Sequence, residues 1–114
     1  MSNSANTFPA SRLSTDQLTR IIEEAMFYQC ACPAQIARAL LDLQELYKYQ
    51  RSCQSEREAD LGVHARIMLS AERAYSEFEI CLIDVLTMED WDMDTLTMPE
   101  GLRRRRDAAM DGGG

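Results

Sequence analysis

Apolar residues recur at helical spacing over two long stretches of the chain, and a capping-box sequence precedes each stretch. Ser14 and Gln17 form the first box, and Ser55 and Glu58 form the second. An apolar residue at every third or fourth position is typical of an amphipathic helix. The first series is Leu18, Ile21, Ile22, Ala25, Met26, Ile36, Leu40, Leu43 and Tyr47, and the second is Leu61, His64, Met68, Ala71, Tyr75, Phe78, Leu82 and Val85. Because no stretch shows the alternation of a strand, we predict an all-α fold.

Pro33 interrupts the first stretch, and a proline inside a helix removes one hydrogen bond and usually breaks the helix. The three-and-four spacing nevertheless continues across it, from Ile22 to Tyr47. A line at seven-residue spacing also continues, over Leu18, Ala25, Cys32, Ala39, Leu46 and Cys53. We therefore predict an antiparallel hairpin of two long helices, the first kinked at Pro33 and the second ending near Met88. A three-helix bundle is the alternative.

The two ends of the chain differ from these stretches in composition. Residues 1–13 and 111–114 are predicted to be flexible tails, and three glycines end the second of them. Thr97 and Glu100 repeat the capping spacing and place Pro99 in a first turn, which predicts a short C-terminal helix to Met110. A length of 114 residues is typical of one domain, so we predict a single helical domain over residues 14–110.

A hairpin of two long helices leaves part of its apolar surface uncovered. On the second helix, the apolar series is widened on one side by Ile67, Ala74, Cys81 and Met88. Four helices bury such faces more completely than two helices do. We therefore expect a homodimer that forms a four-helix bundle, or docking on a larger protein partner. The three-helix alternative would be a compact monomer.

Charge and composition exclude several classes of protein. The formal net charge of −7 argues against a nucleic-acid-binding protein, which usually carries a basic face. A hydrophobic fraction of 46% argues against a wholly disordered chain. Residues 1–15 contain no apolar run of the kind that export needs, and no segment is long and apolar enough to span a membrane. We therefore expect a cytoplasmic protein with no membrane contact and with reduced cysteines.

Three of the four cysteines are predicted to converge. For a turn near residue 54, residues of two antiparallel helices lie level when their numbers sum to roughly 109. Cys81 then lies level with residues 28–32, which makes Cys30, Cys32 and Cys81 a candidate metal site. Cys53 lies about 30 Å from Cys32 along the helix and is interpreted as structural.

Several chemistries fit these three cysteines. Thiolates suit zinc, copper(I) or an iron–sulfur cluster, and Glu24 or Glu77 would supply the fourth ligand that zinc prefers. In a redox interpretation, Cys30 and Cys32 form a reducible disulfide, or one of them pairs with Cys81. In a third interpretation, the cysteines are small buried hydrophobic residues of the apolar stripe.

Three other motifs have structural interpretations. His64 lies on the core-facing stripe and is interpreted as an interface histidine, with pH sensing as the alternative. Residues 90–101 resemble an EF-hand loop but hold Thr95 and Gly101 where that loop needs a glycine and a glutamate, so we predict an acidic connection between helices over residues 89–94. Its apolar residues are expected to fold back on the helices; they are Trp91, Leu96 and Met98. The arginines at 103–106 are interpreted as neutralising this connection rather than as a phosphate-binding cluster.

The sequence contains no glycine-rich phosphate loop, no E-x-x-H di-iron pattern and no histidine-based triad. We therefore expect that the protein is not an enzyme. We predict a small helical interaction or regulatory protein that acts through an apolar helical face. The alternative is a thiol-based metal-binding or redox-responsive protein that uses Cys30, Cys32 and Cys81.

Overall fold

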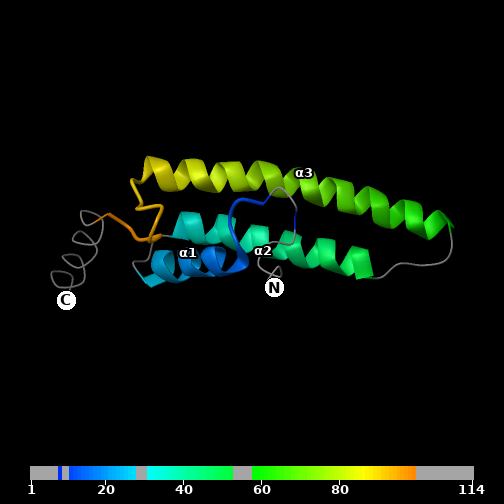
Figure 1. Ribbon diagram of the computed structural model, residues 1–114, viewed down its shortest axis with the longest axis horizontal. Helices are drawn as coiled ribbons and strands as arrows, with labels where there is room; N and C mark the ends of the chain where they lie inside the picture. Colours follow the sequence, from blue (N-terminus) through cyan, green and yellow to red (C-terminus); the bar gives the residue numbers. More distant parts are fainter. Residues whose placement is uncertain (1–7, 9–10, 28–30, 53–57, 100–114) are drawn as a thin grey trace.

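Helices account for most of the chain in the computed structural model. The structure describes residues 8, 11–27, 31–52 and 58–99. Its helices are α1 (Thr15–Phe27), α2 (Ala31–Ser52) and α3 (Glu58–Met88). The described residues contain no strand, and an isolated bridge joins Asp92 to Thr97. The prediction of an all-α fold is therefore confirmed. The molecule is elongated, with extents of 62 × 28 × 24 Å (Figure 1).

The first stretch contains two helices, so the prediction of one long helix kinked at Pro33 is wrong. α1 ends at Phe27, α2 begins at Ala31, and α1 packs alongside α2 (Figure 1). Pro33 lies in the first turn of α2, where a backbone N–H has no intrahelical partner and a proline costs little. A continuous helix would instead lose a hydrogen bond at Pro33. The unbroken spacing was misleading because each helix needs its own apolar face, whether or not the two are continuous.

α1 begins as its capping box predicts. The Ser14 hydroxyl accepts a hydrogen bond from the backbone N–H of Gln17 at 3.0 Å, and Gln17 Oε1 accepts one from the N–H of Ser14 at 2.8 Å. The apolar stripe of α1 is fully buried at Leu18, Ile21 and Ala25. Packing of this stripe, rather than the 13-residue length, gives α1 its stability.

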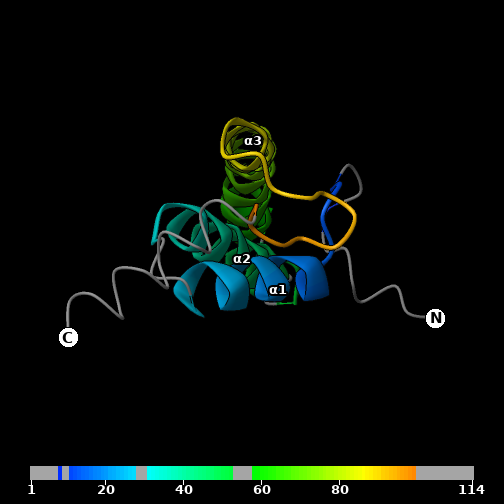
Figure 2. The same cartoon turned by 90° about the vertical axis from the view of Figure 1, so that its left-hand side faces the viewer.

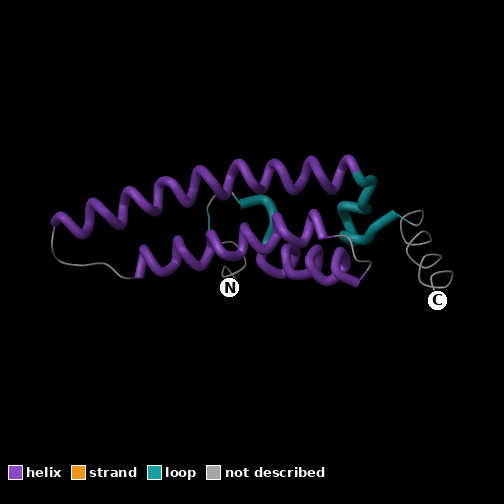
Figure 3. The backbone as a smooth tube through the Cα atoms, turned by 180° about the vertical axis from the view of Figure 1, so that it is seen from behind, coloured by secondary structure: helices purple, strands orange, loops and turns teal. Residues whose placement is uncertain are grey.

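α3 lies alongside α2, and two side-chain hydrogen bonds define the register of the pair (Figure 3). Gln44 Nε2 donates to the Tyr75 hydroxyl, and the Tyr47 hydroxyl donates to Glu72 Oε2, each at 2.9 Å. The residue numbers of each pair sum to 119, whereas a turn near residue 54 predicts roughly 109. At these two pairs the difference of ten residues corresponds to a shift of about 15 Å along α3.

A non-helical segment before α1, residues 8 and 11–14, lies across α2 and α3 (Figure 1). Phe8 is buried between two aromatic rings, with centroid distances of 4.5 Å to Tyr47 and 4.3 Å to Tyr75. Leu13 is buried as well. Phe8 and Leu13 of this N-terminal segment therefore belong to the packed core, although the sequence predicts a flexible tail over residues 1–13.

The loop after α3, residues 89–99, also packs on the helices. Asp90 adopts a φ of 60°, and the N–H of Trp91 donates to the carbonyl of Leu86 at 3.0 Å, which ends α3. The side chains of Trp91, Leu96 and Met98 are buried in the same core as α1 and α3. The prediction that these three residues fold back onto the apolar stripe of the helices is confirmed.

Other predictions fall outside the described residues. These are the positions of Cys30 and Cys53, residues 100–110 of the short C-terminal helix, the arginines at 103–106 and the tail at 111–114.

Candidate functional site

α2 and α3 have one face that the N-terminal segment and α1 cover, here called the closed face. Its central side chains are Gln44, Tyr47, Tyr75 and Glu79, all buried. Buried polar groups at a helix interface are either satisfied structural contacts or candidate chemistry, and the hydrogen bonds of each group distinguish the two.

Glu79 binds the N-terminal segment. Its Oε2 accepts hydrogen bonds from the backbone N–H groups of Arg12 and Leu13, both at 2.8 Å, and lies 3.3 Å from the Ser11 hydroxyl. A buried carboxylate is strongly destabilising unless donors of this kind surround it. Glu79 is therefore an anchor for the segment, and its oxygen is already occupied by protein donors.

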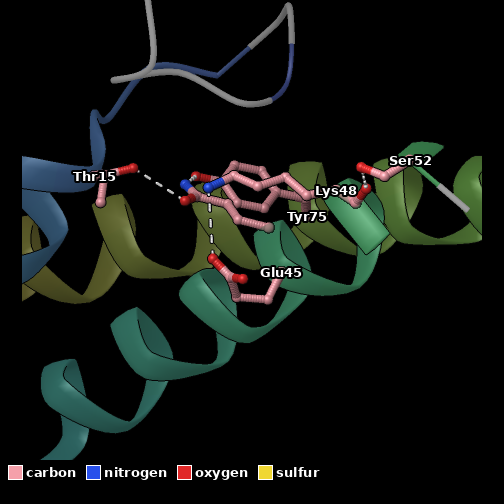
Figure 4. A network of polar contacts seen from close by, with 6 residues as sticks. Thr15, Glu45, Lys48, Ser52 and Tyr75 are labelled. Atoms are coloured by element: carbon pink, nitrogen blue, oxygen red, sulfur yellow. Dashed lines mark hydrogen bonds and ion pairs between the residues drawn. The ribbon is translucent and has the colours of Figure 1, made fainter. Parts of the chain in front are cut away.

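Gln44 links all three helices. Its Nε2 donates to the Tyr75 hydroxyl at 2.9 Å, and its Oε1 accepts a hydrogen bond from Thr15 Oγ1 at 3.0 Å. Figure 4 shows Thr15 and Tyr75 reaching this point from α1 and α3. Because these polar groups satisfy one another, the closed face is a structural network rather than a catalytic site.

Glu24 anchors the loop after α3 in the same way. It is buried on α1, and its Oε2 accepts a hydrogen bond from the backbone N–H of Met98 at 2.9 Å. Its Oε1 lies 3.3 Å from a guanidinium nitrogen of Arg20. Glu24, which the sequence offers as a zinc ligand, is thus engaged by protein donors, whereas the other offered carboxylate, Glu77, is exposed on α3.

The opposite flank of α2 and α3 is open and apolar. An open groove of about 450 Å³ lies between the two helices, and its apolar lining is Leu43, Leu46, Ile67, Ala71 and Ala74. Arg66 and Ser70 form a polar edge, where an Arg66 guanidinium nitrogen donates to the Ser70 hydroxyl at 2.7 Å. The groove is therefore an apolar surface with one cationic side chain at its border.

The sequence contained a signal for this groove. Leu46 belongs to the line at seven-residue spacing on α2, and Ile67 and Ala74 belong to the residues that widen the stripe of α3. In both helices these positions lie beside the central stripe, and they face the groove rather than the closed face. The signal located the apolar residues, but only the register of α2 and α3 shows that they form one surface.

The structure places the two described cysteines at different levels of the α2–α3 pair. Cys32 is an exposed free thiol in the first turn of α2, and Cys81 is a half-buried free thiol on α3. With level positions summing to 119, Cys81 lies level with Arg38, about 9 Å from Cys32 along α2. The structure therefore does not bring these two thiols level, and the three-cysteine site with Cys30 stays a prediction.

His64 and the acidic loop have local partners. His64 Nδ1 lies 2.6 Å from Oε1 of the buried Gln50, so the histidine contacts α2. In the loop, Asp92 Oδ1 accepts hydrogen bonds from the backbone N–H groups of Asp94 at 2.8 Å and Thr95 at 3.1 Å. These two bonds, with that of Thr95 the stronger cause, lower the pKa of Asp92. The carboxylate therefore shapes a turn.

No group of three or more histidine, cysteine, aspartate or glutamate side chains that could hold a metal occurs among the residues that the structure describes. In the same part of the chain, no helix is both long and apolar enough to cross a membrane. Comparisons with protein-family models, curated proteins and solved structures found no match to the chain. The groove between α2 and α3 is therefore assigned as the candidate functional site on its own geometry.

Proposed function

We propose that the chain is a small, non-enzymatic helical interaction protein that binds an amphipathic helix of a protein partner in the groove between α2 and α3. The observation that carries the proposal is the contrast between the two faces of this helix pair. On the closed face the polar groups are satisfied and the apolar groups buried, whereas along the groove Leu46 is exposed and Leu43, Ile67 and Ala74 are half-buried. A shallow apolar groove between two helices is the kind of surface on which an amphipathic helix packs.

A helix is the occupant that suits the groove. Two antiparallel helices form a furrow along their axes, and a third helix packs by placing its ridges in that furrow. The small side chains of Ser70, Ala71 and Ala74 on α3 leave room for close approach of a backbone. The guanidinium of Arg66 at the groove edge favours a partner helix with an acidic residue beside its apolar stripe.

The cytoplasm is the location that we propose for this interaction. The two described cysteines are free thiols, which is typical of a reducing compartment. No observation among the described residues favours the thiol-based alternative function over the interaction function.

The test uses helical peptides as the probe. The full chain is screened against a display library of amphipathic helices of about five turns, and the selected peptides are measured by fluorescence anisotropy. We expect binders with apolar residues at helical spacing, and we expect Leu46→Asp to weaken them at least about tenfold, because it places a charge in the apolar groove.

Met93→Asp is the matched control. Met93 is 38% exposed and Leu46 is 39% exposed, but Met93 lies in the loop after α3 and does not line the groove. The control is expected to bind the peptides as the natural chain does. Absence of any selected binder, or equal loss of binding in both variants, would contradict the proposed function.

A further inference from the structure

The outer side of α3 carries charges of opposite sign at its two ends. Arg66 and Arg73 occupy the first half of the helix, and Glu77 and Asp84 occupy the second half; all four are exposed. At 100° per residue these positions lie within about 40° of one another around the helix axis. None of the four takes part in an ion pair within the described part of the chain. Figure 2 shows α3 with α1 and α2 on one side of it only.

Exposed apolar residues flank this charged line on both sides. Val63 and Met88, which are 56% and 80% exposed, lie on one side of it. Leu69 and Ile80, which are 42% and 43% exposed, lie on the other side. Each pair is within about 60° of the charged line. The eight residues together are called the outer face of α3 below.

The outer face of α3 is complementary to itself when two helices run antiparallel. Arg66 and Asp84, Arg73 and Glu77, Val63 and Met88, and Leu69 and Ile80 have residue numbers that sum to about 150 in every case. In a pair of helices related by a two-fold axis beside residue 75, each residue therefore lies level with its complement in the second copy. Basic residues meet acidic ones, and apolar residues meet apolar ones on the same side.

We propose that two copies of the chain form an antiparallel homodimer through the outer face of α3. The proposal rests on the proposed interaction function and adds a second surface, of whose eight residues Arg66 alone also lines the groove. In this dimer the apolar pairs bury surface, and the charge pairs select the antiparallel register. The apolar lining of the groove takes no part in this pairing, so each copy keeps that lining for a partner helix.

The test reverses charges in the full chain and measures its mass in solution by sedimentation velocity at about 100 µM, well above the dissociation constant of a weak specific dimer. The natural chain is expected to be a dimer. Glu77→Arg with Asp84→Arg makes the charged line wholly basic and is expected to raise the dissociation constant at least about tenfold. Arg66→Glu with Arg73→Glu makes it wholly acidic and is expected to have the same effect.

Mixing the two double variants is the decisive step. A basic face and an acidic face complement each other, so the mixture is expected to form one-to-one heterodimers although neither variant pairs with itself. Since each copy has a net charge of −7, a change of net charge alone could alter association. Asp16→Arg with Glu23→Arg on α1 changes the net charge as much as Glu77→Arg with Asp84→Arg, and is expected to leave the dimer intact.

Three outcomes would overturn the dimer: a monomeric natural chain, double variants that dimerise like the natural chain, or a mixture without heterodimers. Circular dichroism of each variant confirms that its helices are formed before its mass is interpreted. The two proposals are tested independently. Leu46 lies in the groove and outside the outer face of α3, so Leu46→Asp is expected to weaken peptide binding and to leave the dimer unchanged.

Discussion

The closed face and the groove are built from the same two helices, yet their residues have different roles. On the closed face, Gln44 and Glu79 are buried and satisfied by other segments, since Thr15 donates a hydrogen bond to Gln44 and the N–H of Leu13 donates one to Glu79. Along the groove, Leu46 and Ile67 remain partly exposed because no described segment covers them. A helix pair thus becomes a core where a segment returns to cover it, and a contact surface where none does.

The first way to test this comparison is to shorten one leucine on each face. Leu40→Ala removes a fully buried side chain and is expected to destabilise the fold by about 2 to 5 kcal/mol, because it leaves a cavity. Leu46→Ala in the groove is expected to cost less than about 1 kcal/mol, since its side chain is already partly solvated. Chemical denaturation followed by circular dichroism measures both. Equal losses would show that the groove is covered in solution.

The second prediction concerns the anchor of the N-terminal segment. Glu79→Ala leaves the N–H groups of Arg12 and Leu13 without their acceptor and is expected to cost about 2 kcal/mol. Glu79→Gln keeps one acceptor oxygen and is expected to recover part of that loss. The exposed Glu23→Ala on α1 is the matched control, expected within about 0.5 kcal/mol of the natural chain. A Glu79→Ala variant as stable as this control would remove the anchoring role.

The third prediction compares two tyrosines of α2. Tyr47 is 8% exposed and Tyr49 is 63% exposed. Burial first, and then the hydrogen bond that the Tyr47 hydroxyl donates to Glu72, raise the pKa of Tyr47 above its ordinary value of 10.0. Because the folded state holds this proton more tightly, the resulting stability is present below pH 10 and is lost as pH rises through the raised pKa.

Nuclear magnetic resonance titration of ring resonances measures this difference, with Glu72→Gln as the companion variant. The substitution removes the negative charge beside Tyr47, so the pKa of Tyr47 is expected to fall toward its ordinary value. A Tyr47 midpoint at or below its ordinary value of 10.0 would contradict its burial on the closed face.

The smallest expected effect is in the loop after α3. The N–H groups of Thr95 and Asp94 hold the pKa of Asp92 below its ordinary value of 3.8. With a lowered pKa in the folded state, this carboxylate stabilises the turn above about pH 4 and ceases to do so as pH falls through the lowered pKa. Carboxyl-carbon titration by nuclear magnetic resonance is expected to show a midpoint below 3.8; a higher midpoint would mean that the turn is open.

Local sequence was enough to identify the helical segments and much of the core. The capping box at Ser14, the end of α3 at Met88 and the burial of Trp91 follow from short-range rules, because hydrogen bonds and apolar spacing within a few residues decide them. The apolar residues beside the central stripes, Leu46 on α2 and Ile67 and Ala74 on α3, also identified part of the groove lining. The break before α2 was missed because two separate helices and one kinked helix share the same spacing.

Tertiary structure decided which of many similar residues carry a special role. In the sequence, nothing distinguishes Glu24 and Glu79 from the exposed glutamates. Each is a buried anchor because it binds backbone N–H groups far away in the chain, that of Met98 for Glu24 and those of Arg12 and Leu13 for Glu79. The register of α2 and α3 placed Cys81 level with Arg38 and joined Leu46 to Ile67 in one groove. Such contacts depend on where separate segments meet, and helical periodicity contains no information about that relative position.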